Sequence, residues 1–312
     1  RQPDNCHWFT PMVAVASLLA VVAGLPQAMS PPGWPEFTPA QEQVLPAAAV
    51  TATPTFTVAP LPLSAVRAAG GTRLSDAQKL NTAYLELLDP DRLLYTFRTV
   101  AQLPHEGVEP YGGWESPDYV YGLINGHFTG HFLSALAFTA VSIDGSDAVR
   151  LTNVSRYLVA ELAACQAAIA AKSPALAGFV SAYAIDHIER MEAHNSTRVW
   201  APYYTLHKIM AGLLDTHTLL GSGQALTVLE GLADFVHGRV TRLIDAKGAA
   251  WWQQCLGVEF GGMNEVAYSL YSLTRKPQHL ELAHFFYKQV FMDPLATGRD
   301  SLANNHANTH LP

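Results

Sequence analysis

The chain has 312 residues, of which 49% are hydrophobic and 14% are charged. It therefore has enough apolar surface for a packed core and is not globally disordered. The 19 lysines and arginines against 26 aspartates and glutamates give a net charge of -7, and no basic run is present, which excludes a protein that follows nucleic-acid phosphates. Cys6, Cys165 and Cys255 lie far apart, so the sequence shows neither a disulfide framework nor a thiolate metal site.

Residues 1–66 differ in composition from the rest of the chain, with 11 of the 20 prolines. Within them, residues 12–25 form an apolar run that is shorter than the roughly 20 residues of a membrane helix but suits the hydrophobic region of a signal peptide, about 7–15 residues long. We expect residues 1–30 to be a signal or anchor segment and residues 31–66 to be a Pro-rich linker. Secretion is the favoured localisation, and anchoring to a membrane by residues 12–25 is the alternative.

From about residue 67 the apolar residues recur at helical spacing. Residues 75–78 are typical of a capping box that begins a helix, and the Asp-Pro pair at 89–90 ends it. Further helices are expected at 126–142, 146–172, 203–220, 223–245, 262–274 and 277–292. These six form three successive antiparallel hairpins, and strand-like alternation is confined to a weak stretch at 178–183. The sequence predicts an all-α fold of helical hairpins, either an open solenoid or a closed toroid.

The loop at residues 111–115, Tyr-Gly-Gly-Trp-Glu, combines glycines with an aromatic ring and a carboxylate. Trp114 can stack on the apolar face of a sugar and Glu115 can accept hydrogen bonds from its hydroxyls. This interpretation places both residues at the rim of a sugar pocket. The alternative is a packed turn in which Trp114 covers the core.

Four polar residues at helix starts are further candidates. His127 and His131 are four residues apart on one helix face, a spacing that can bind zinc, but the glutamate of an H-E-x-x-H motif and a third ligand are absent. Hydrogen bonding to a polar ligand or to helix ends is therefore favoured. His207 lies on an inward-facing stripe with Tyr203, where a lone histidine is more often a satisfied core residue. Glu265 lies in the first turn of a helix, where the helix dipole by itself favours a carboxylate.

Five motifs together resemble those of glycoside hydrolase family 127 in their order and spacing. They are residues 111–115 (Tyr-Gly-Gly-Trp-Glu), 126–131 (Gly-His-Phe-Thr-Gly-His), 200–208 (Trp-Ala-Pro-Tyr-Tyr-Thr-Leu-His-Lys), 260–265 (Phe-Gly-Gly-Met-Asn-Glu) and 306–310 (His-Ala-Asn-Thr-His). The resemblance runs from about residue 61 to residue 312. It implies an (α/α)6 toroid, with residues 67–312 as an incomplete catalytic domain, and the release of terminal β-L-arabinofuranose from plant-type glycans with retention.

The family uses a zinc-bound cysteine as nucleophile, because zinc lowers the thiol pKa. None of the three cysteines matches its position, so the resemblance implies that the catalytic residues and the zinc ligands lie after Pro312, that no residue of this chain binds metal, and that the chain by itself is inactive. The residues that carry over bind the sugar of an arabinose-containing oligosaccharide or glycoprotein glycan. They are His127, His131, His207, Glu265 and His306, with Trp114, Glu115 and Tyr203 at the pocket rim.

One departure from the family pattern is the longer link at residues 119–125, which is expected to alter the pocket rim. Two other classes of function remain open at this point. The first is a different sugar enzyme on an α/α toroid, an epimerase or a lyase that uses histidine bases without zinc. The second is a carbohydrate-binding relative that has no catalytic activity.

Overall fold

The computed structural model describes residues 61–118, 123–195 and 197–301, which contain eleven α-helices and no β-strand. All of them belong to the compact unit Leu45–Pro312. Within this part of the chain, residues 178–183 form no strand, and an isolated parallel bridge joins Leu123 to Val199. The all-α prediction is therefore confirmed. Residues 1–60, with the predicted export segment, and His306 lie outside the described residues.

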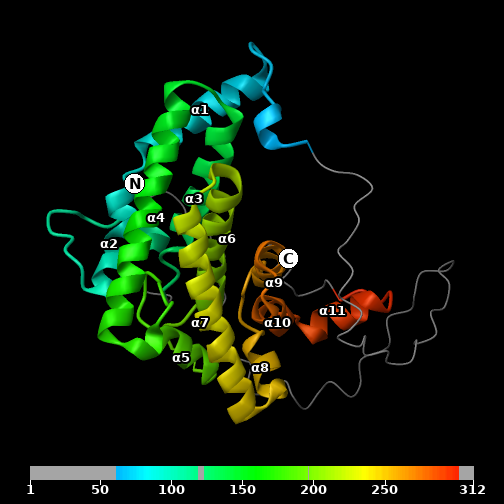
Figure 1. The fold of residues 1–312 in the computed structure, drawn as a ribbon. Helices are drawn as coiled ribbons and strands as arrows, with labels where there is room; N and C mark the ends of the chain where they lie inside the picture. The colour runs from blue at the N-terminus through cyan, green and yellow to red at the C-terminus, as the bar shows by residue number, and fades with distance from the viewer. Residues whose placement is uncertain (1–60, 119–122, 196, 302–312) are drawn as a thin grey trace, which may run out of the picture. The chain divides into compact units, whose positions relative to one another are not determined.

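Three helical hairpins form the body of the fold (Figure 1). They pair α3 (His127–Ser142) with α4 (Ser146–Lys172), α6 (Pro202–Leu220) with α7 (Gly223–Lys247), and α9 (Met263–Thr274) with α10 (Pro277–Phe285). The predicted bounds agree to within two residues except in the last helix. The expected helix at 277–292 ends at Phe285, and α11 (Gln289–Ala296) follows. The side chain of Trp252 donates to the carbonyl oxygen of Phe285 and the buried Phe286 packs against Trp252, so the core interrupts the helix there.

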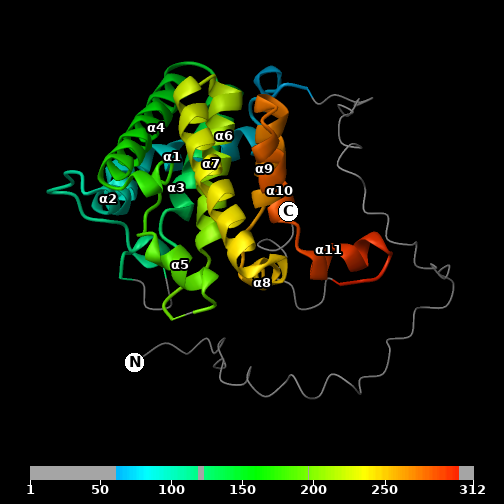
Figure 2. The ribbon, with the colours of Figure 1, turned by 60° about the horizontal axis from the view of Figure 1, so that its bottom comes forward.

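The hairpins stack so that α3, α6 and α9 form one layer while α4, α7 and α10 form the other (Figure 2). The first layer is parallel: the Thr205 hydroxyl reaches the carbonyl oxygen of Ile124, and further along both helices Ser134 is hydrogen-bonded to Asp215. As a result the N-terminal ends of α3 and α6 lie at the same end of the layer.

Two glycines allow α3 and α6 to approach each other backbone to backbone. A Cβ atom at Gly130 would lie 2.0 Å from the carbonyl oxygen of Lys208, and one at Gly212 would lie 2.4 Å from the carbonyl oxygen of Gly130. No real side chain fits at such distances, because backbone atoms cannot move aside as a side chain can. The close contact fixes the positions of His127 and His131 relative to His207.

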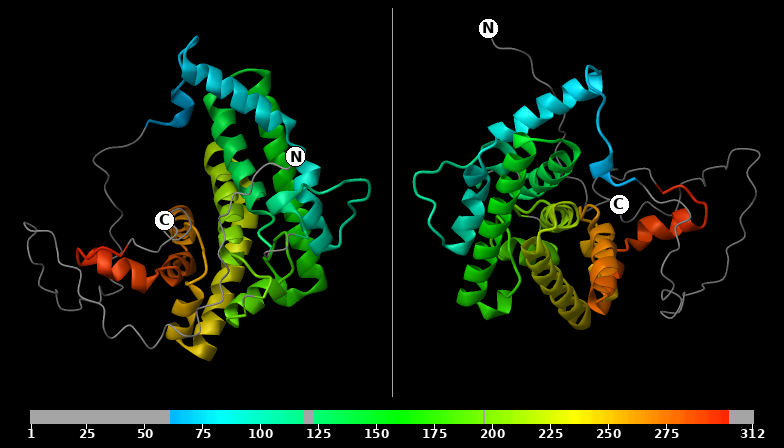
Figure 3. Two further views of the ribbon diagram at one scale, coloured as in Figure 1. Left: turned by 180° about the vertical axis from the view of Figure 1, so that it is seen from behind. Right: turned by 45° about the horizontal axis from the view of Figure 1, so that its top comes forward.

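The N-terminal helix, α1 (Arg73–Leu87), corrects one prediction. It begins three residues before the expected start, because Thr72 rather than Ser75 is the N-cap and the two side chains form a reciprocal capping box. Its predicted apolar stripe is also exposed rather than packed, with Leu80 73% and Leu87 80% accessible. The helix instead passes over the ends of α3 and α4 (Figure 3), where its polar residues Gln78 and Asn81 contact α3.

Three helices were not predicted from the sequence: α2 (Pro90–Ala101), α5 (Asp186–Glu192) and α8 (Ala249–Cys255). The Asp-Pro pair that ends α1 also begins α2, since Asp89 caps the new helix and Pro90 occupies its first turn. The short helices α5 and α8 contact each other near the start of α6, so they support the end of the layer where the candidate site lies.

The described end of the expected linker contains a short 3-10 turn, Leu63–Ala65, which lies against α3. Directly after it, Arg67 forms a two-pronged ion pair with Asp144, with nitrogen–oxygen distances of 3.0 and 3.1 Å. The chain is therefore attached to the helical hairpins from about residue 63, a few residues earlier than the predicted domain boundary.

One described helix, α4, is long and apolar enough to cross a membrane by length and composition. Its side chains Leu158, Leu162 and Cys165 are fully buried in the core, where α4 packs against α2, α3 and α7. Packing within the fold therefore accounts for part of the apolar character of α4, since 33% of its most apolar window is buried.

Candidate functional site

The candidate site lies at the N-terminal ends of α3, α6 and α9. The first turn of α3 carries His127 and the second carries His131, with 6.2 Å between the two ring centroids. The ring of Tyr204 on α6 lies 6.2 Å from the His127 ring and 6.5 Å from the His207 ring. Residues separated by about 80 positions in the sequence are thus brought within the dimensions of one small ligand.

His207 is held against the loop that leads into α9. A Cβ atom at Gly261 would lie 2.4 Å from Nδ1 of His207, and Gly261 itself has a positive φ of 60°, which favours glycine. His207 is 6% exposed, and its Nδ1 atom has no hydrogen-bond partner among the described residues. Burial, together with the nearby positive charge of Lys208, lowers the pKa of His207 to about 3. The imidazole is therefore neutral at physiological pH.

Glu265 comes close to His207 across the same loop. Both Nε2 of His207 and Cβ of Glu265 lie within 4 Å of the position that a Cβ atom at Gly262 would occupy. The Glu265 side chain is exposed and accepts a hydrogen bond of 3.1 Å from the Ser269 hydroxyl. The neutral imidazole of His207 and the exposed side chain of Glu265 thus lie at the same loop contact. Together they can form several hydrogen bonds to one polar ligand.

His131 and Lys208 face the same space. The His131 side chain is exposed, yet partial desolvation and the nearby Lys208 and His127 lower its pKa to about 4. The ammonium group of Lys208 lies 4.8 Å from the centroid of the Tyr204 ring, and burial lowers the pKa of the lysine. His131 is therefore expected to be neutral as well, so it offers one donor and one acceptor nitrogen.

Asp215 was missed in the sequence analysis. It follows His207 by eight residues, about two turns, on α6, and this helical spacing was the signal that would have found it. Its carboxyl group is hydrogen-bonded to Ser134, and burial together with the negative charge of Glu265 raises its pKa. The carboxylates of α6 and α9 thus influence each other directly. The sequence analysis does not single out Tyr204 either, because it selects the neighbouring Tyr203 for the pocket rim.

Trp114, predicted for the pocket rim, is exposed and lies beside His127. Its side chain is 56% exposed, with its ring centroid 6.0 Å from that of His127 and 6.2 Å from that of Trp200. The indole Nε1 of Trp200 in turn donates to Glu259 at 3.2 Å. The indole of Trp114 therefore contacts two aromatic rings, those of His127 and Trp200. Its exposed surface is available to stack on a sugar ring.

Two residues predicted for the rim, Glu115 and Tyr203, are buried. Glu115 is 9% exposed and accepts hydrogen bonds from the backbone N–H groups of Gly126 and Phe128, so it caps α3. Tyr203 is 3% exposed and its hydroxyl donates to Glu192, which also pairs with Arg239. Tyr203, in the first turn of α6, thus points into the core, whereas the next residue, Tyr204, lies beside His127.

The described cysteines do not form a zinc site. Cys165 and Cys255 are both buried, and burial raises the pKa of each thiol to about 12. No group of three or more histidine, cysteine, aspartate or glutamate side chains among the described residues is arranged to hold a metal ion. A thiolate nucleophile is therefore not available at either position.

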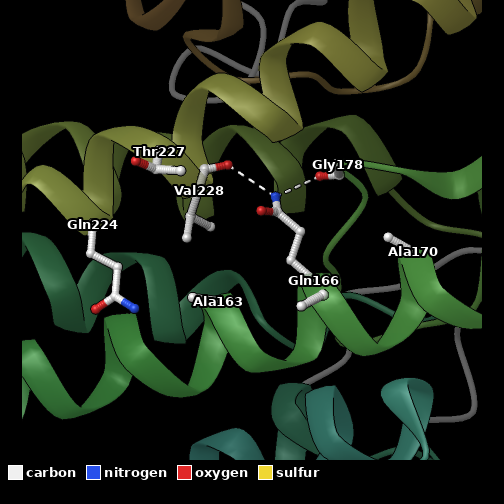
Figure 4. A pocket seen from close by; sticks show the side chains of 8 residues that line it. Ala163, Gln166, Ala170, Gly178, Gln224, Thr227 and Val228 are labelled. Carbon is white, nitrogen blue, oxygen red and sulfur yellow. Dashed lines mark hydrogen bonds between the residues drawn. The ribbon is translucent and has the colours of Figure 1, made fainter.

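The described part of the structure also contains two cavities whose lining residues bear on where the site lies. One of about 590 Å³ lies between α4 and α7 and is lined by small and amide side chains (Figure 4). There Gln166 donates to the carbonyl oxygens of Gly178 and Val228, so its polar group already has partners, and no titratable residue lines the cavity. A second cavity, of about 330 Å³, borders Trp114, Glu115 and His127 and is otherwise lined mostly by apolar residues. Neither of these two cavities thus brings together as many titratable side chains as the described ends of α3, α6 and α9 do.

An array of helical hairpins with imidazoles, carboxylates and an exposed tryptophan at one end fits a carbohydrate-active protein with a toroid-type fold. Residues 70–312 match the family described as the beta-L-arabinofuranosidase, GH127 catalytic domain. The match covers more than half of the chain, so the chain belongs to this family and is a glycoside hydrolase of the arabinofuranosidase type. The family implies an arabinose-containing glycan as substrate. Comparison with curated proteins gives no match.

Proposed function

We propose that this protein releases terminal β-L-arabinofuranose from plant-type glycans with retention of configuration. The observation that carries the proposal is the convergence of His127, His131, His207 and Glu265 from three helices. Two of the imidazoles have lowered pKa values and offer paired donors and acceptors, while Glu265 accepts from hydroxyls. Such a set matches the hydroxyl groups of one furanose ring, with Trp114 placed for its apolar face.

In this proposal the described residues bind and orient the sugar and do not attack it. The zinc-bound cysteine that the family resemblance implies has no counterpart among them, since both buried thiols have raised pKa values. We assign the nucleophile, the acid/base glutamate and the zinc ligands to a part of the protein after Pro312. His306 completes the proposed sugar-binding set, and residues 67–312 by themselves are expected to be inactive.

The experiment is hydrolysis of an aryl β-L-arabinofuranoside by the full-length protein, with the released anomer followed by NMR before it equilibrates. Release of the β anomer first supports the proposal, whereas the α anomer first contradicts retention. An unsaturated or epimerised product would identify the alternative lyase or epimerase. Binding of L-arabinose without any turnover would identify a carbohydrate-binding relative. Activity of residues 67–312 alone would show that the nucleophile has been misplaced.

We also propose that the protein is exported. The support is the composition of residues 12–25, which suits a signal peptide better than a membrane anchor. Mass spectrometry of the mature protein from its native source tests the proposal. A start of the mature chain close to residue 30 is expected, and a retained peptide covering residues 8–28 would contradict a cleaved signal.

A further inference from the structure

Glu115 contacts both the backbone and the side chain at the start of α3. The helix begins at Gly126, which has a φ of 93° and no side chain to cap the free N–H groups. Oxygen Oε2 of Glu115 accepts from the N–H of Gly126 at 2.6 Å, and Oε1 accepts from the N–H of Phe128 at 3.0 Å. A carboxylate from a distant loop therefore replaces the missing cap, at the helix end where the dipole favours negative charge.

The same carboxylate reaches the ring of His127. Nδ1 of His127 lies 3.0 Å from Oε1 of Glu115 and 2.7 Å from the carbonyl oxygen of Ile124. Both neighbours are acceptors, so Nδ1 carries the proton: it donates to the carbonyl oxygen of Ile124, while the Glu115 carboxylate lies at ion-pair distance from the same nitrogen. In the neutral ring Nε2 is then the acceptor, and it makes no hydrogen bond to the described residues.

We infer that Glu115 is a positioning residue, which holds His127 in the Nδ1-protonated tautomer and directs its Nε2 lone pair to a sugar hydroxyl. Glu115 is 9% exposed and His127 is 6% exposed, so neither group rotates freely in water. The pairing of a carboxylate with Nδ1–H fixes the tautomer as it does in other histidine sites. The role differs from the direct sugar contact predicted from the sequence, and it rests on the proposed function only for the identity of the ligand.

The first test is thermal unfolding of the full-length protein without ligand. His127→Asn keeps a donor at the place of Nδ1, whereas His127→Gln removes it. We expect Glu115→Gln to lower the Tm of the wild type and of His127→Asn by a similar amount, about 2–4 °C, and that of His127→Gln by clearly less. The exposed Glu106 in the same loop provides the control Glu106→Gln, which should leave the Tm unchanged. Equal shifts in all three backgrounds would show that Glu115 caps α3 only, and would overturn the inference.

The second test is binding of L-arabinose, measured by calorimetry on the same variants. Glu115→Gln should weaken binding about tenfold, the loss of roughly one hydrogen bond. The double variant Glu115→Gln/His127→Asn should bind no more weakly than His127→Asn, because both changes act through the same nitrogen. Losses that multiply would show that Glu115 contacts the sugar itself, and would overturn the positioning role. If the wild type neither binds L-arabinose nor hydrolyses the arabinofuranoside, the proposed function fails, and the thermal test still decides whether Glu115 holds His127.

Discussion

Gly261 and His207 are in contact across the loop that precedes α9, with 2.4 Å between the Cβ position of the glycine and Nδ1 of the imidazole. The loop therefore packs directly against the imidazole ring. Any side chain at residue 261 must displace the ring, so the orientation of His207 depends on this glycine.

Gly261→Ala is expected to weaken sugar binding as well as stability. The left-handed backbone alone costs about 1–2 kcal/mol for alanine, and the clash with His207 adds to this. Gly221→Ala is the matched control, since Gly221 also has a positive φ but no atom lies within 4 Å of its Cβ position. L-Arabinose affinity and urea unfolding should both be measured. Equal affinity in the two variants would contradict the role of the loop in holding the ring.

The contact between α3 and α6 should tolerate no side chain at Gly130. A Cβ atom there would meet the backbone of Lys208 and Ile209 at 2.0–2.6 Å, so the two helices must separate. We expect Gly130→Ala to destabilise the protein by about 3 kcal/mol, the upper range for overpacking. Gly223→Ala, in the first turn of α7 with open space around it, should be neutral or slightly stabilising. Chemical denaturation curves of both variants decide the matter.

His207 should make stability depend on pH. In the folded protein its pKa of about 3 keeps it neutral, whereas in the unfolded chain it takes up a proton near pH 6.5. The unfolded state then binds more protons, and the free energy of unfolding falls as the pH decreases from about 6.5 toward 3, by up to about 1.4 kcal/mol per pH unit.

The measurement is urea unfolding of the wild type and of His207→Asn at pH 7, 6 and 5. Asparagine does not titrate, so its curve should fall less steeply, while groups common to both proteins cancel in the difference. Parallel curves would show that His207 is protonated in the folded state. At pH 7 we expect His207→Asn to raise the activation free energy of turnover by more than it lowers the free energy of unfolding, because an oriented hydroxyl contact contributes most in the transition state.

The ion pair between Glu192 and Arg239 should be among the most costly to break. The two groups are joined by hydrogen bonds of 2.8 and 2.6 Å, and Glu192 is 7% exposed. Removing Arg239 leaves the buried Glu192 carboxylate without its cationic partner and with the Tyr203 hydroxyl as a remaining donor, which costs about 3–5 kcal/mol. Arg239→Met should show this loss in denaturation experiments. Glu230→Gln, which breaks a more exposed pair with Lys276, should cost only about 0–1 kcal/mol. Similar losses in both variants would contradict the difference in burial.

The sequence predicts the helices of the hairpins well because their apolar residues repeat along most of each element. It does not predict which helix face finds a partner: in α1 the stripe with Leu80 and Leu87 is exposed, whereas Thr82 is buried. The same limit applies within the site. Helical spacing places Tyr203 and Tyr204 next to each other, and only the positions of Glu192 and Arg239 determine that Tyr203 turns inward. The cap provided by Glu115 joins residues 11 and 13 positions apart, so no local pattern reveals it.

The parallel arrangement of α3, α6 and α9 has an electrostatic consequence. Each helix directs its positive end toward the site, but Glu115 and Glu265 lie at two of these ends, while the first turn of α6 contains no acidic residue. The positive end of the α6 dipole is therefore not offset by a carboxylate in its own first turn. A positive potential there disfavours cations and further protonation of the His207 imidazole, and it attracts the oxygen lone pairs of an uncharged ligand. The direction of the backbone thus favours ligands that present oxygen lone pairs at this end of the layer, and disfavours cations.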